Sequence, residues 1–101
     1  MTIGQKIKFL RVEQGMLQRE LAYKLNVSEA FLSKVENSQK LPKRSDLVKI
    51  SEIFNEPIKE LEKFWLAYKV YEAIRQEDLG LEVLDLVKEQ LSTYRKNNSR
   101  K

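Results

Sequence analysis

The stretch that decides the fold is QRELAYKLNVSEAFLSKVEN, at residues 18–37. Leu21 and Leu25 lie four residues apart, on one face of a short helix. Asn26 follows, and asparagine tolerates a positive φ better than any residue except glycine, so the chain can turn sharply there. Ser28 is a good N-cap for the next helix, whose apolar side continues to the end of the stretch. The residues therefore predict two short helices joined by a tight turn.

Apolar periodicity predicts further helices on both sides of this stretch. A first helix is expected over about residues 3–14, ended by Gly15 in a left-handed cap. A fourth helix should begin at residue 44 or 45, and two longer ones should cover about residues 57–77 and 81–94. Because no segment alternates with period two over the length of a strand, we expect an all-α fold that ends in a C-terminal helical hairpin.

Charge divides the chain into three blocks. Residues 1–56 carry 10 basic and 7 acidic side chains, residues 57–94 carry 5 and 8, and residues 95–101 carry 4 and 0. A basic first part and an acidic second part suggest contact with a polyanion in the first and with protein in the second. We expect a binding domain over 1–56, a dimerisation region over 57–94, and a basic tail over 95–101 that frays.

The composition argues against an enzyme. Cysteine and histidine are both absent, which removes disulfides, thiol and imidazole catalysis, and nearly all zinc sites. No nucleophile and base stand at a useful spacing either, and we expect no cofactor and no metal. No apolar run approaches the roughly 18 residues that span a bilayer, and the first residues lack the features of a signal peptide. We expect a cytoplasmic protein without a membrane partner.

Over about residues 3–61 the sequence resembles the Cro/CI-type helix-turn-helix family, also called the xenobiotic response element family. This resemblance implies a lambda-repressor-like helix-turn-helix bundle that places the second helix of the motif in the major groove of double-stranded DNA. The matching residues are Ile3, Gly4, Ile7, Leu10, Arg11, Gly15, Gln18, Glu20, Leu21, Ala22, Leu25, Val27, Ser28, Leu32, Ser33, Val35, Glu36, Asn37, Pro42, Leu47 and Ile50.

The resemblance also implies which side chains meet DNA. Gln18 would bond a phosphate and brace the recognition helix, while Glu29, Ala30 and Lys34 would face cytosine, thymine and guanine edges. Phe31 has two interpretations, a sugar or methyl contact and packing against the adjacent helix, of which packing is favoured. The full expected DNA-binding set is Gln18, Arg19, Ser28, Glu29, Ala30, Phe31, Ser33, Lys34, Asn37, Ser38, Lys40, Lys43 and Arg44.

Three positions depart from the family pattern. Leu17 stands where a threonine N-cap is frequent, at a cost of about 1 kcal/mol of helix support. Asn26 and Ser38 stand where glycine is frequent, which leaves the loop at Ser38 less defined than the turn at Asn26. None of the three lies on the recognition face.

After about Leu61 the resemblance fades, and the two last helices carry more large apolar side chains than one buried face needs. Surplus aromatic surface often marks an interface. We expect a homodimer, with an extension of the bundle or capture of a different protein as alternatives. The candidate dimer residues are Phe64, Trp65, Tyr68, Tyr71, Leu84, Val87, Leu91 and Tyr94.

These features predict a sequence-specific transcriptional regulator, most simply a dimeric repressor of the phage type or a restriction-modification controller. Its operator would be an inverted repeat. The alternative is an antitoxin that neutralises a toxin through its C-terminal helices and regulates its own operon. Both readings give the chain double-stranded DNA as a partner.

Overall fold

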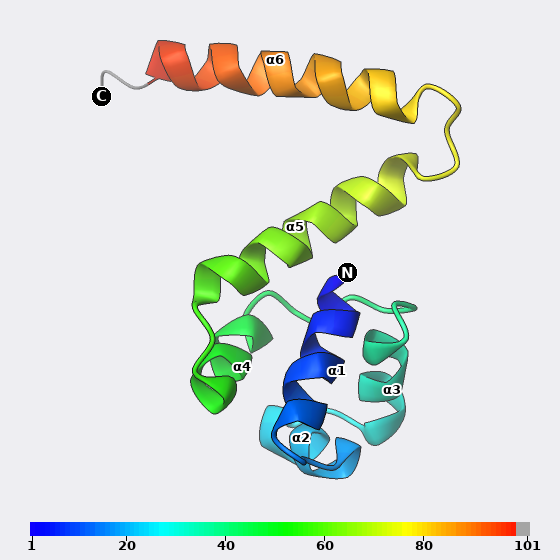
Figure 1. Cartoon of the computed structure of the whole chain (residues 1–101), viewed down its shortest axis with the longest axis vertical. Coiled ribbons are helices and arrows are strands. Elements are labelled where there is room, and N and C mark those ends of the chain that lie inside the picture. Colours follow the sequence, from blue (N-terminus) through cyan, green and yellow to red (C-terminus); the bar gives the residue numbers. More distant parts are fainter. Residues whose placement is uncertain (99–101) are drawn as a thin grey trace. The chain divides into compact units, whose positions relative to one another are not determined.

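The computed structural model describes residues 1–98, and within them the secondary structure is helical with no strand. The all-α expectation is therefore confirmed (Figure 1). The helices are α1 (Ile3–Glu13), α2 (Gln18–Leu25), α3 (Glu29–Glu36), α4 (Asp46–Phe54), α5 (Ile58–Ile74) and α6 (Gly80–Asn98).

The last helix is longer than expected. It continues to Asn98, so the expectation that the chain frays from Arg95 is wrong for residues 95–98. No glycine or proline interrupts these residues, and Arg95 and Lys96 lie in the last turn, where positive charge stabilises the carbonyl end of a helix. The remaining residues of the expected tail, 99–101, lie outside the described part of the chain.

The chain forms two compact units, unit 1 (Met1–Val70) and unit 2 (Tyr71–Lys101). The division lies inside α5 rather than at residue 56, where the change in charge suggested it. Leu61 and Trp65 of α5 are 0% and 9% exposed and belong to the same buried cluster as the first four helices. The first part of α5 is thus part of the binding domain's core.

The core of unit 1 is built from the apolar faces that the periodicity indicated. Burial of each large aliphatic or aromatic side chain in this core contributes about 1.5–3 kcal/mol to the stability of the fold. The cluster consists of Ile3, Ile7, Leu21, Ala22, Leu25, Leu32, Val35, Leu47, Ile50, Phe54, Leu61 and Trp65. Because α3 contributes to this cluster from one side only, its other side remains available.

The turn between α2 and α3 forms as expected. Asn26 adopts the left-handed conformation with φ 57° and ψ 44°, and the backbone N–H of Val27 donates to the carbonyl of Ala22 at 3.0 Å. Ala22 is only 3% exposed, and a residue this small lets the two helices approach closely at this point.

The caps of α2 and α3 differ. Ser28 accepts a hydrogen bond from the N–H of Phe31 at 3.0 Å and caps α3. Leu17 offers α2 no such acceptor, but Glu20 accepts from the N–H of Leu17 at 3.1 Å. This side chain supplies the half of a capping box that does not depend on a threonine.

Unit 2 consists mainly of α6, in which Gly80 is the one buried residue. Its apolar stripe is exposed: Leu84, Val87, Leu91 and Tyr94 are 38–64% accessible. Within the described residues, no helix is long and apolar enough to cross a membrane.

Candidate nucleic-acid interface

The outer face of α3 is polar and exposed, while its inner face is buried. Glu29, Ala30 and Lys34 are exposed, and Leu32 and Val35 are 2% and 1% exposed. Ser28 at the N-cap is also exposed, and Ser33 is half-buried. The helix therefore presents its N-terminal turns outward on a rigid apolar base, which is the arrangement that major-groove reading requires.

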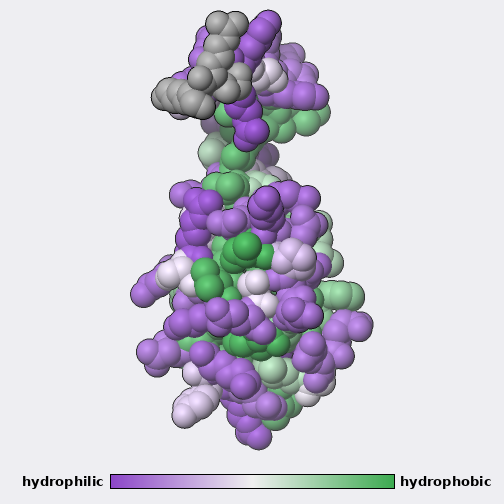
Figure 2. Space-filling model, turned by 90° about the vertical axis from the view of Figure 1, so that its left-hand side faces the viewer, coloured by the Kyte–Doolittle hydropathy of each residue, from purple (hydrophilic) through white to green (hydrophobic). Residues whose placement is uncertain are grey.

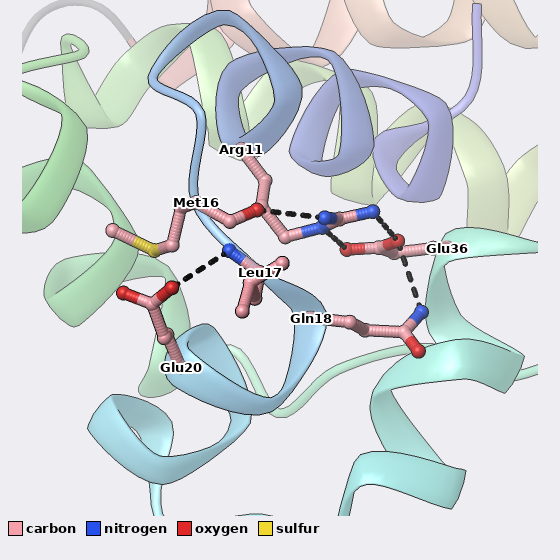
Figure 3. A network of polar contacts seen from close by, with 6 residues as sticks. All are labelled: Arg11, Met16, Leu17, Gln18, Glu20 and Glu36. Carbon is pink, nitrogen blue, oxygen red and sulfur yellow. Dashed lines mark hydrogen bonds and ion pairs between the residues drawn. The ribbon is translucent and has the colours of Figure 1, made fainter.

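A buried ion pair fixes the C-terminal end of α3 (Figure 3). Arg11 of α1 donates to Glu36 through Nε and Nη2, at 2.7 and 2.9 Å, and through Nη1 to the carbonyl of Met16 at 2.8 Å. Gln18 donates to the same carboxylate at 3.2 Å. The Glu36 side chain is 2% exposed and that of Arg11 13%. This network joins the last turn of α1, the first residue of α2 and the last residue of α3.

Gln18 thus braces α3 by its hydrogen bond to the Glu36 carboxylate. It is half-buried at the first position of α2, next to the exposed side chain of Arg19.

A glycine allows α1 to approach the end of α3 closely. A Cβ placed on Gly4 would collide with the carbonyl oxygen of Val35 and would lie 3.0 Å from its carbonyl carbon. The backbone of α3 is therefore set against the backbone of α1 as well as against the core.

The loop of residues 37–44 follows α3 and carries exposed polar groups. Asn37, Lys40, Lys43 and Arg44 are exposed. The N–H groups of residues 39 and 40 both donate to the carbonyl of Lys34, at 2.8 and 3.3 Å, so the loop continues from the last turn of the helix. Figure 2 shows that hydrophilic residues cover much of the visible face of unit 1, with apolar patches between them.

Ser38 is tied into the protein itself. It has a positive φ of 62°, and its hydroxyl lies 2.7 Å from the hydroxyl of Thr2. Its N–H donates to Val35, and its carbonyl accepts from Tyr68. The expected DNA-binding role of Ser38 would therefore compete with an existing side-chain partner.

Two other members of the expected set have partners in unit 1. Phe31 is half-buried and packs against the core, in agreement with the packing interpretation. Arg44 forms an ion pair with Glu62 at 3.2 Å, and its guanidinium lies 5.3 Å from the centre of the Trp65 ring.

The structure divides the candidate dimer residues into two groups. Trp65 is buried in the core of unit 1, and Phe64 and Tyr68 are half-buried against it. For Trp65 the assignment to a dimer surface needs correction, because its side chain packs within its own chain. The exposed members are Tyr71, Leu84, Val87, Leu91 and Tyr94.

A family model described as helix-turn-helix matches residues 7–61, which is more than half of the chain. The chain belongs to the Cro/CI-type helix-turn-helix family. Members of this family are DNA-binding transcriptional regulators, and this protein is one of them. Comparisons with curated proteins and with solved structures returned no match. In this helix-turn-helix protein α2 and α3 are the motif, and α3 is the recognition helix.

Proposed function

We propose that this regulator is a dimeric repressor that binds an inverted-repeat operator, as phage-type repressors and restriction-modification controllers do. The observation that carries the proposal is the exposed N-terminal half of α3 above a fully buried inner face. In the major groove, Lys34 donates to guanine O6 and N7, Glu29 accepts from cytosine N4, and Ala30 contacts a thymine methyl. Asn37, Lys40 and Lys43 hold phosphates and fix the register.

The dimer contact in this proposal is the exposed stripe of α6. The side chains of the stripe are spaced by three, four and three residues: Leu84, Val87, Leu91 and Tyr94. Apolar residues along the seam of a two-helix coiled coil have this spacing. In Figure 2 hydrophobic side chains gather on one side of the part that contains α6. A self-complementary seam of this kind favours a second copy of the chain as its partner.

Charge favours an antiparallel pair of α6 helices. Residues 80–89 carry three acidic side chains and one basic side chain, whereas residues 90–98 carry two basic side chains and no acidic one. Antiparallel pairing brings the acidic half of each helix beside the basic half of the other, and parallel pairing would bring like charges together. Opposed helix dipoles favour the same orientation.

Light scattering with two matched variants tests the dimer. Leu91 and Leu86 are both 54% exposed, but Leu86 lies off the stripe. Leu91→Asp is expected to give a monomer that binds the operator weakly, while Leu86→Asp stays dimeric. A mass near 12.0 kDa for the intact chain, without concentration dependence, would refute the dimer and leave DNA binding in place.

The antitoxin alternative uses the same stripe for a different protein. It is favoured if the chain purifies with a stoichiometric basic partner instead of a second copy.

For the repressor, transcription from a promoter that overlaps the selected site is expected to fall when the protein is added, and a rise would contradict repression.

A further inference from the structure

We propose that α5 is a positioning element for the DNA-contacting loop, acting through the hydroxyl of Tyr68 and the indole N–H of Trp65. The inference rests on the proposed function, because it assigns these groups a role in how residues 37–44 hold phosphates. Neither side chain touches DNA in this account. Both act through the backbone of the loop.

Three residues of α5 contact the loop, and each lies about one helical turn after the previous one. The first of the three contacts the end of the loop, and the last contacts its beginning. Glu62 accepts from Arg44 at 3.2 Å. Trp65 donates from Nε1 to the carbonyl of Pro42 at 2.8 Å, and Tyr68 donates to the carbonyl of Ser38. The spacing of 62, 65 and 68 places the three side chains near one face of the helix. The loop therefore runs along α5 from residue 44 back to residue 38.

The loop needs such support because its backbone is locally unfavourable. A serine at φ 62° costs about 1–2 kcal/mol relative to the right-handed region. Such a conformation persists where surrounding contacts over-determine it. Thr2 holds the Ser38 side chain, and Tyr68 holds its carbonyl. Since Ser38 connects α3 to the exposed Lys40 and Lys43, its conformation sets where these cations lie.

The contacts made by Tyr68 and Trp65 are shielded from water to different degrees. Trp65 is 9% exposed and its bond to Pro42 is buried, so it defines the middle of the loop. Tyr68 is half-buried, and its hydroxyl can be removed with little loss of packing. Tyr68→Phe is therefore the cleaner test.

The expected effect is a loss of phosphate contact without a change in base reading. Phosphate contacts carry no sequence information but determine the salt dependence of binding. In Tyr68→Phe, operator affinity should fall roughly three- to tenfold. The slope of log affinity against log salt should flatten by about one. The preferred operator sequence should be unchanged. Tyr23→Phe is the control, because Tyr23 is 86% exposed on α2.

The experiment is a set of salt titrations on the selected operator with the full-length wild type, Tyr68→Phe and Tyr23→Phe. If the wild type prefers no sequence, the proposed function fails. If the wild type binds specifically and Tyr68→Phe keeps the same affinity and slope with a lower melting temperature, the hydroxyl is purely structural and the inference is overturned. Altered base preference in Tyr68→Phe would also overturn it.

Amide hydrogen exchange on the free proteins gives a readout that does not depend on DNA. The N–H groups of Gln39 and Lys40 should exchange faster in Tyr68→Phe than in the wild type, while that of Val27 in the turn before α3 should not change. Equal protection at Gln39 and Lys40 in both proteins would contradict the positioning role.

Discussion

Replacing either partner of the Arg11–Glu36 pair should destabilise unit 1 more than replacing both. In Glu36→Met, the Arg11 guanidinium loses the carboxylate but keeps its hydrogen bond to the carbonyl of Met16, and the Arg11 side chain is 13% exposed. Arg11→Met leaves a carboxylate that is 2% exposed and keeps the Gln18 amide. Removing one partner of a buried pair costs about 3–5 kcal/mol, because the remaining charge is left without compensation.

The burial values rank the two single variants. Arg11→Met should lower the free energy of unfolding by about 5 kcal/mol and Glu36→Met by about 3 kcal/mol. The loss is larger for Arg11→Met because this variant leaves the carboxylate, which is the more deeply buried charge. The double variant leaves no buried charge and places two apolar side chains together. Its loss should therefore be smaller than either single loss.

Urea unfolding followed by tryptophan fluorescence measures these losses. Trp65 is the one tryptophan in the sequence and lies in the core of unit 1, so its emission reports on that unit. Single losses below about 1 kcal/mol are typical of exposed pairs and would refute a buried pair whose charges compensate each other. A double variant whose loss equals the sum of the single losses would refute it as well, because it would mean that the two charges do not interact.

Two further contrasts follow from the geometry. Gly4→Ala should lower the free energy of thermal unfolding by about 3 kcal/mol, because its Cβ would displace the Val35 backbone. Gly15→Ala should lower it by only about 1 kcal/mol, because only the positive φ of Gly15 opposes the change. A larger loss at Gly15 than at Gly4 would contradict the close approach of α1 to α3. In gel-shift assays, Lys34→Ala should relax base preference by roughly 1–3 kcal/mol at one position, whereas Lys43→Ala should weaken all sequences and flatten the salt slope by about one. Equal effects of the two lysine variants on specificity would contradict the division between reading and positioning.

The motif could be predicted from sequence because its signals are local. The positive φ at Asn26 and the cap at Ser28 depend on the chemistry of single residues. The apolar spacing of α2 and α3 fixes which faces are buried, and this in turn identified the exposed Glu29 and Lys34.

The role of α5 could not be predicted in the same way. Periodicity shows that Trp65 lies on an apolar face, but a face that packs on its own core and one that packs on a second chain have the same pattern. The bond to Pro42 joins residues 23 positions apart and needs the tertiary fold. The same holds for Arg11 and Glu36, whose pairing requires α1 and α3 to be neighbours.

Sequence reading by α3 is best tested by selecting binding sites from a random pool of duplex oligonucleotides and titrating them in gel shifts against bulk competitor DNA. We expect that one sequence is enriched and bound with an affinity on the order of 10⁻⁸ to 10⁻¹¹ M at physiological salt. This sequence should be an inverted repeat with half-site centres roughly 34 Å apart. An intact, folded protein that binds every duplex equally would contradict the claim that α3 reads DNA sequence.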